Sequence, residues 1–333
     1  MIQRKHALAL FSGGLDSILS VVWMRRLGYQ VSPVCFFTSY IPPDRAINSA
    51  QANGLPLITR EITDIHWAML QDPLHGYGKN FNPCIDCHGL MFRLACQMLP
   101  ELGADFLISG EVLGQRPMSQ RRNALQAVDK LSGCADLIVR PLSQKLLPDT
   151  KPLREGWVDQ DNMLAIQGRG RTQQLELAKQ FGITFPSPGG GCLLTDRNFS
   201  LRLQDLISHA QADPGNIALL RWGRHFRLSD SVKLVIGRTR EDNLGLEEAG
   251  YPGLYLKLRD LEGPLGLLTV PDPSPALLEL AASIVLQYSS KAPSPGWVKY
   301  GVDRNYTSEI CVAKCPEEVF RPYLISLDKE RRC

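Results

Sequence analysis

The sequence predicts an α/β fold built on a parallel sheet, followed by a smaller α+β domain. Two observations predict the sheet: short apolar runs alternate with amphipathic segments, and a glycine turn joins the first run to the first expected helix. A third observation marks the second domain, because short extended runs dominate beyond the proline- and glycine-rich stretch 186–191. We therefore expect two domains, residues 1–197 and 198–333.

The apolar runs of the first domain are rich in β-branched and aromatic residues, which favours strands. The expected strands cover residues 7–11, 31–37, 57–62, 105–109 and 139–142. The segments between them have helical periodicity. The expected helices cover residues 16–27, 46–53, 90–102 and 173–181.

The second domain has an α+β pattern, in which several short strands come before one long apolar helix. The expected strands cover residues 226–228, 232–236, 254–258 and 265–270. The expected helices are a connecting helix at 199–210 and the apolar helix at 276–288.

Composition excludes some classes of protein. Hydrophobic residues make up 44% of the 333 residues, which excludes a disordered or collagen-like chain. The net charge of +3 neither requires nor excludes a nucleic-acid partner, so any RNA site must be local. We find no export signal and no apolar stretch long enough to span a bilayer, and we expect a cytoplasmic protein. The chain has nine cysteines. In a reducing compartment, closely spaced cysteines are more often metal ligands or catalytic thiols than partners in disulfides.

The segment Ser12-Gly13-Gly14-Leu-Asp16-Ser17 lies between the first expected strand and helix. Two glycines allow close approach to an anion, and the helix N-terminus directs N–H groups toward it. Asp16 is suited to hold Mg²⁺ against bound phosphates. The alternative is an ordinary strand–turn–helix junction. The segment lacks both the Gly-Lys-Ser/Thr of the P-loop and the G-x-G-x-x-G of dinucleotide-binding folds.

These six residues resemble the SGGxDS signature of the PP-loop ATP pyrophosphatases, whose fold is of the adenine nucleotide alpha hydrolase type. The resemblance implies that the loop binds the pyrophosphate part of ATP. It also implies that the enzyme transfers AMP to an oxygen atom, which turns that oxygen into a leaving group.

Cys84 and Cys87 form a C-x-x-C pair directly before a helix, and Cys192 follows three glycines far away in the sequence. The pair is suited to one metal, one cluster or a redox couple. Three thiolates fit a cluster with one open iron better than they fit structural zinc. The alternative is two half-buried cysteines and an unrelated loop thiol.

The segments 84–95, 103–115 and 119–120 resemble the PP-loop domain of tRNA 4-thiouridine synthetases, over roughly residues 5–195. The tRNA 2-thiouridylases are more distant relatives. The resemblance implies that Cys84, Cys87 and Cys192 hold an iron–sulfur cluster, expected to be [4Fe-4S], and that Gly110 and Gln115 face the nucleotide. A persulfide on Cys192 is the other mechanism of the superfamily. We find no rhodanese-like persulfide donor, which favours the cluster.

The segments 224–243, 258–264 and 281–289 resemble the NFACT-R domain, which is associated with RNA binding, over about residues 222–303. Leu258 departs from the histidine–alanine pair common there. Arg224, Arg227 and Arg238 are the expected RNA contacts, because arginines bind phosphates and stack on bases. The alternative is a solvated edge of a small sheet.

Together these patterns predict an ATP- and Mg²⁺-dependent sulfurtransferase that thiolates a uridine in tRNA. Sulfide or a cysteine desulfurase would supply the sulfur, and a homodimer is consistent with relatives that often dimerise. One alternative is an enzyme of the same superfamily that acts on an acceptor other than RNA. Another is an RNA-binding factor that senses ATP without catalysis.

Overall fold

A computed structural model describes residues 5–187 and 192–326. The chain divides into two compact units, residues 1–191 and 192–333. The segment 192–197, assigned to the first domain from the sequence, lies in the second unit. There the Asp196 carboxylate accepts a hydrogen bond from the Phe199 amide and caps the following helix. The glycines 189–191 lie outside the described residues.

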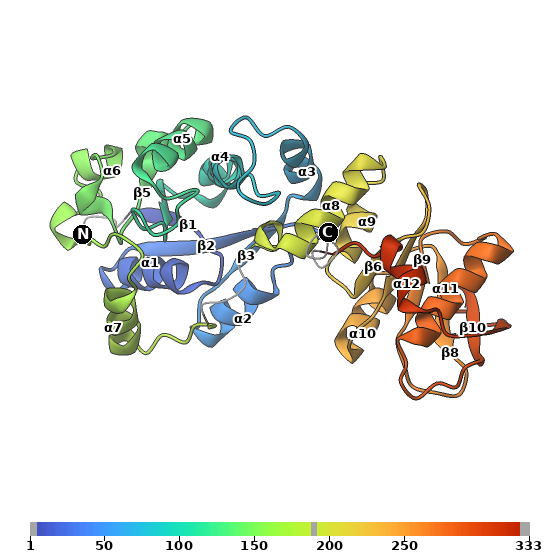
Figure 1. The fold of residues 1–333 in the computed structure, drawn as a ribbon. Helices are drawn as coiled ribbons and strands as arrows, with labels where there is room; N and C mark the ends of the chain where they lie inside the picture. The colour runs from blue at the N-terminus through green and yellow to red at the C-terminus, as the bar shows by residue number, and fades with distance from the viewer. Residues whose placement is uncertain (1–4, 188–191, 327–333) are drawn as a thin grey trace. The chain divides into compact units, whose positions relative to one another are not determined.

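The first unit contains a five-stranded parallel sheet, as the sequence predicts (Figure 1). Its strand order is β3-β2-β1-β4-β5, and all of its strand pairs are parallel. The strands are β1 (His6–Leu10), β2 (Gln30–Phe37), β3 (Ile58–Glu61), β4 (Phe106–Ser109) and β5 (Ile138–Val139).

Helices cover both faces of this sheet, which explains why the central strands β1 and β4 are mostly apolar and buried. Ala7 and Ala9 of β1 pack into a core with α1 and α2, whereas Leu8 packs into a core with α4 and α5 on the other face. Figure 1 shows α4 and α5 above the sheet and α1 and α7 below it. The helices are α1 (Leu15–Arg26), α2 (Asp44–Ala52), α3 (Thr63–Gln71), α4 (Cys84–Leu102), α5 (Arg122–Ser132), α6 (Lys151–Arg154) and α7 (Thr172–Phe181).

Helix α4 begins at Cys84 rather than at residue 90, the start expected from the sequence. Gly89 lies inside the first turns of α4, where a glycine costs helix stability. A Cβ on Gly89 would lie 2.5 Å from the Leu131 Cβ of α5, so the glycine allows the two helices to pack closely. The C-x-x-C pair is therefore part of the helix itself.

The second unit contains a six-stranded antiparallel sheet with the order β11-β10-β8-β9-β7-β6. Helix α11 packs on one face and α10 on the other. The strands are β6 (Arg224–Arg227), β7 (Lys233–Ile236), β8 (Leu254–Leu258), β9 (Gly266–Leu268), β10 (Gly296–Val302) and β11 (Ser308–Val312). The helices are α8 (Arg197–Ser208), α9 (Pro214–Leu219), α10 (Arg240–Glu248), α11 (Pro275–Gln287) and α12 (Glu317–Phe320). Within residues 5–187 and 192–326, no helix is long and apolar enough to cross a membrane.

Candidate functional site

The candidate residues of the first unit gather at one edge of the parallel sheet, where its strands end. Ser12–Ser17 follows β1, Gly110 follows β4, and His88 in the first turns of α4 contacts Glu111, the residue after Gly110. In open α/β sheets this carboxyl edge is where ligands bind. The chain thus brings segments that are distant in sequence to a single edge.

The glycine loop has the geometry of an anion site. Gly13 has a φ of +70°, and a Cβ on it would lie 2.6 Å from the Arg45 carbonyl oxygen, so only glycine fits. Gly14 is extended at the N-terminus of α1, and no side chain of the described residues caps this end. The first N–H groups of α1 are therefore available to an anion. Ser17 Oγ donates to the Gly14 carbonyl, and Ser12 lies exposed above it.

Arg45 of α2 is a functional candidate that the sequence analysis missed. Its Nη2 would lie 3.8 Å from a Cβ placed on Gly14, so a cation lies beside the anion loop. The two residues are far apart in sequence and no motif joins them. Only the packing of α2 against the loop, where Ser49 Oγ donates to the Gly13 carbonyl at 2.9 Å, brings them together.

Asp16 is a half-buried residue whose carboxylate is only partly satisfied. Its Oδ2 accepts a hydrogen bond from Gln115 Nε2, and Gln115 Oε1 accepts one from the buried Gln174 at 2.8 Å. Its Oδ1 is buried and has no hydrogen-bond partner among the residues described. Burial raises the pKa of Asp16, against the hydrogen bond from Gln115 and the charge of Arg171. An anionic oxygen of this kind is suited to a hard cation such as Mg²⁺.

Gly110 explains how the end of β4 meets the loop. A Cβ on Gly110 would lie 2.4 Å from the carbonyl carbon of Asp16, so any other residue would push the two segments apart. This contact brings Gly110, Gln115 and Asp16 together, three residues that the sequence singled out separately.

A buried ion network lies next to Gly110. Glu111 accepts hydrogen bonds from Arg140 Nε at 2.8 Å and lies 2.8 Å from His88 Nδ1. Arg140 also pairs with Asp129 at 2.6 Å. The Arg140 charge and the His88 hydrogen bond outweigh burial and lower the pKa of Glu111 to about 2. The network ties α4, α5 and the ends of β4 and β5 together, and the sequence motifs did not reveal it.

The paired thiols lie in the first turn of α4, and each sulfur has a polar nitrogen beside it. Asn82 Nδ2 donates to Cys84 Sγ at 3.0 Å, and His66 Nε2 lies 3.4 Å from Cys87 Sγ. The Tyr40 hydroxyl lies 2.6 Å from His66 Nδ1. Burial lowers the pKa of His66 to about 4, which keeps its ring neutral at physiological pH. A sulfur that accepts a hydrogen bond at a helix N-terminus, as Cys84 Sγ does from Asn82, is suited to carry negative charge.

Cys192 belongs to the second unit, where its side chain is exposed. Its carbonyl accepts hydrogen bonds from Thr195 and starts a short 3₁₀ turn. The part of the chain that the structure describes contains no group of three or more His, Cys, Asp or Glu side chains arranged to hold a metal ion. The three-cysteine ligand set remains a prediction from the sequence.

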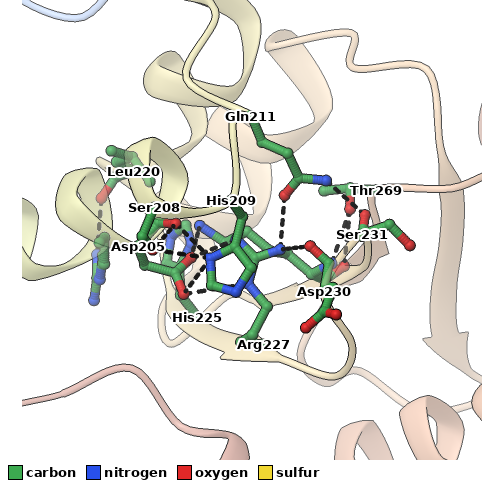
Figure 2. A network of polar contacts seen from close by, with 12 residues as sticks. Asp205, Ser208, His209, Gln211, Leu220, His225, Arg227, Asp230, Ser231 and Thr269 are labelled. Carbon is green, nitrogen blue, oxygen red and sulfur yellow. Dashed lines mark hydrogen bonds and ion pairs between the residues drawn. The ribbon is translucent and has the colours of Figure 1, made fainter. Parts of the chain in front are cut away.

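The three arginines singled out for RNA differ in their surroundings. Arg227 has a side chain only 12% exposed and pairs with Asp205 at 2.5 Å, and it also donates to Gln211 and Asp230 (Figure 2). Arg238 is 48% exposed beside Asp242. Arg224 lies 4.4 Å from the ring centroid of Tyr288. The Arg227 guanidinium is therefore occupied within the protein, whereas the Arg238 guanidinium donates its Nε to Asp242 at 3.1 Å and remains exposed to solvent.

Asp205 pairs with two cationic side chains, Arg227 and Lys233, and no sequence motif indicated this network. Lys233 Nζ lies 3.6 Å from its carboxylate, and burial lowers the pKa of Lys233 to about 7. Burial also lowers the pKa of Arg202 to about 10 and that of His225 well below its usual value. Figure 2 shows this network between α8 and β6. It holds the start of the second unit together.

Comparison with known proteins bears on both units. Residues 3–145 match the family model described as "Thiamine biosynthesis protein (ThiI)". These residues form a PP-loop domain of the ThiI type. Residues 223–324 match "NFACT protein RNA binding domain", so the second resemblance is also confirmed. The ThiI-type domain ends in this match just after β5, and the NFACT-type match begins just before β6.

Two curated relatives have the same description, "tRNA-specific 2-thiouridylase MnmA". The protein of Pseudomonas fluorescens is 25% identical over 279 residues, which cover 78% of this chain and 70% of that protein. The protein of Pseudomonas aeruginosa is 24% identical over 341 residues, which cover 96% of this chain and 87% of that protein.

Two solved structures are also similar to parts of the chain. One is a predicted subunit of tRNA methyltransferase from Methanocaldococcus jannaschii, at 20% identity and a TM-score of 0.32, covering 41% of this chain and 68% of that one. The other is the C-terminal part of the fibronectin/fibrinogen-binding protein from Streptococcus suis, at 10% identity and a TM-score of 0.28. The match covers 72% of this chain and 90% of that one. Both TM-scores are too low to define a shared fold.

Proposed function

We propose that the protein is an ATP-dependent tRNA sulfurtransferase that adenylates a uridine carbonyl and replaces its oxygen with sulfur. The observation that carries this proposal is the carboxyl edge of the parallel sheet. An anion loop, a carboxylate with a buried oxygen that has no partner among the described residues, and two thiols with nitrogen neighbours all lie there. The ThiI-type match and the two thiouridylase relatives support the same reaction class.

ATP would bind with its pyrophosphate part over Ser12–Ser17. The backbone N–H groups at the start of α1 and the Arg45 guanidinium supply positive charge to the phosphates. Mg²⁺ would be held by Asp16 Oδ1, since this oxygen is buried without another partner among the described residues. Gly110 and Gln115 hold Asp16 in place from the β4 side.

In the first step the uridine carbonyl oxygen attacks the α-phosphorus of ATP. An oxygen–phosphorus bond forms, the bond to the β-phosphate breaks, pyrophosphate leaves and the ring N–H proton is lost. A sulfur nucleophile then attacks the activated carbon, the carbon–oxygen bond breaks and AMP leaves. Activation is required because a carbonyl oxygen is a poor leaving group, and AMP is a good one.

Helix α4 carries two of the three thiolate ligands that we propose for an iron–sulfur cluster. Cys84 and Cys87 lie one helical turn apart, and the neighbouring N–H groups of Asn82 and His66 suit anionic sulfur. Cys192 is proposed as the third ligand. With three thiolate ligands, a [4Fe-4S] cluster has one open iron that can hold sulfide. A persulfide on Cys192 is the competing source of sulfur.

The second unit is proposed to bind the tRNA. The NFACT-type match supports this role, and Arg238 is exposed enough to contact a phosphate. Arg224, stacked against Tyr288, is proposed as a second contact.

The test uses full-length protein reconstituted anaerobically with iron and sulfide, together with Mg-ATP and unmodified tRNA. Mass spectrometry of the digested nucleosides should reveal a thiouridine that depends on ATP and is absent with Cys192→Ala. Iron loading and ATP turnover without thiouridine would contradict tRNA as the acceptor. Thiouridine that persists in Cys192→Ala would keep the reaction and exclude the role of this cysteine.

A further inference from the structure

Three side chains from two connections of the parallel sheet, β2 to β3 and β3 to β4, meet at the first turn of α4. Tyr40 follows β2, His66 lies in α3 and Cys87 lies in the first turn of α4. The Tyr40 hydroxyl is 2.6 Å from His66 Nδ1, and His66 Nε2 is 3.4 Å from Cys87 Sγ. Tyr40 and His66 are buried, at 0% and 1% exposure. The proposed reaction assigns neither of them a role.

The local backbone fixes Tyr40 and His66 relative to each other. The Ser39 amide donates to Thr63 Oγ1 at 3.0 Å, which ties the turn after β2 to the first residue of α3. Thr63 Oγ1 in turn donates to Glu61 at 2.7 Å. The ring of Tyr40 packs against that of His66, with the centroids 5.7 Å apart. The imidazole therefore has one orientation, and that orientation directs Nε2 to Cys87.

The number of protons on each group determines which atoms donate and which accept in these contacts. A sulfur that serves as a metal ligand has no proton, so it can only accept a hydrogen bond. The imidazole nitrogen that faces this sulfur, Nε2, must therefore carry an N–H. Nδ1 accepts from the Tyr40 hydroxyl, and Nε2 donates to Cys87 Sγ. Both buried polar side chains are satisfied in this arrangement.

We propose that His66, oriented by Tyr40, is a positioning residue that donates a hydrogen bond to the Cys87 sulfur when that sulfur is a cluster ligand. This inference rests on the ligand role of Cys87 in the proposed function. A hydrogen bond to a ligand sulfur withdraws negative charge from it, which makes the cluster easier to reduce. It also holds the thiolate in the direction of the metal, which slows the loss of iron.

The test compares wild type with three variants of the full chain, each reconstituted anaerobically with iron and sulfide. His66→Phe keeps a ring and removes the N–H, Tyr40→Phe removes only the hydroxyl, and His66→Gln keeps an N–H that can reach the same sulfur. Resistance of the iron to a ferrous chelator and the midpoint potential of the cluster are measured. ATP binding and thermal unfolding of the iron-free proteins report on folding.

The chelator concentration that removes iron from His66→Phe should be about 10-fold lower than for wild type. The reason is that supporting partners of metal ligands contribute about 10- to 100-fold to metal affinity. Its midpoint potential should become more negative. Tyr40→Phe should shift both quantities in the same direction by less, and His66→Gln should restore most of the loss.

Iron retention and potential equal to wild type in His66→Phe would overturn the inference, while thiolation by the wild type would leave the proposed function standing. Wild-type protein that takes up no iron would instead overturn the ligand role of Cys87, and the role of His66 with it. If iron-free His66→Phe does not fold, Tyr40→Phe decides. An unchanged potential in that variant would overturn the orienting role of Tyr40.

Discussion

The Asp16 carboxylate is the residue on which the proposed nucleotide chemistry depends most. Gln115 holds one of its oxygens, and the other is buried without a hydrogen-bond partner among the described residues. A raised pKa is the expected result of this burial. In the absence of a cation the ionised side chain destabilises the fold, and a bound Mg²⁺ reverses that effect.

Asp16→Asn should therefore lower the activity without lowering the stability of the fold. The amide cannot replace a carboxylate as a magnesium ligand, so we expect tRNA-dependent AMP formation to fall by about 100-fold or more. The raised pKa means that the native state opposes ionisation, so stability declines as pH rises through the folded pKa. At neutral pH, the metal-free variant should unfold at a temperature equal to or above that of wild type.

The matched control is Glu176→Gln, which makes the same chemical change on the exposed side of α7. It should leave both AMP formation and the unfolding temperature unchanged. Full activity in Asp16→Asn would contradict the assignment of this residue to Mg²⁺.

At the scale of secondary-structure elements, the site depends on how closely the end of β4 approaches the start of α1. The backbone of Asp16 occupies the space of a Gly110 Cβ. The next residue, Glu111, is held by Arg140 and so ties this junction to the end of β5. Packing and charge therefore fix the same short segment from two sides.

Gly110→Ala should destabilise the first unit by about 1–3 kcal/mol, the usual cost of forcing an extra carbon into a packed site. It should also weaken ATP binding, because the clash displaces Asp16. Urea unfolding and nucleotide titration measure the two effects. Gly170→Ala is the control, since nothing lies within 4 Å of a Cβ at that position. Equal stability of the two variants would refute the close approach.

Glu111 predicts a pH dependence of stability. Its pKa is 4.5 in the unfolded chain and about 2 in the folded protein. The carboxylate therefore stabilises the fold fully above about pH 4.5, and this contribution is lost as pH falls through about 2. Glu111→Gln should cost about 3–5 kcal/mol at pH 7, because Arg140 stays buried with less compensation. It should also flatten the change in unfolding temperature between pH 5 and 2, and an unaltered profile would contradict the ion pair.

At the scale of the whole molecule, local sequence patterns predicted the strands and the anion loop. The start of α4 and the site residues Arg45 and Arg140 depend on tertiary contacts, which local patterns do not contain. The parallel sheet was predictable because strands buried on both faces are continuous apolar runs. The start of α4 was missed because Gly89 looks like a helix breaker, although it packs against Leu131. Arg45 and Arg140 were missed as site residues because their partners are distant in sequence.

The second unit shows the same dependence on tertiary contacts. Arg227 and Arg238 look alike in the sequence as RNA contacts, and the structure gives them different surroundings.

Arg238→Ala should weaken tRNA binding and reduce the slope of log affinity against log salt concentration by about one, as expected for one lost phosphate contact. Arg227→Ala should instead lower the stability of the second unit, since it leaves the largely buried Asp205 side chain, 13% exposed, with one cation fewer. Filter binding at several salt concentrations and thermal unfolding distinguish the two; unchanged tRNA affinity in Arg238→Ala would contradict the RNA role.

The measurement that tests the central claim most directly follows one oxygen atom. Unmodified tRNA is prepared with ¹⁸O in its uridine carbonyls and incubated with the reconstituted protein, Mg-ATP and sulfide, and the AMP is analysed by mass spectrometry. Adenylation of the carbonyl predicts that each thiouridine formed leaves one ¹⁸O atom in AMP. Thiouridine formed with unlabelled AMP, or AMP formed without tRNA, would contradict activation of the uridine at this site.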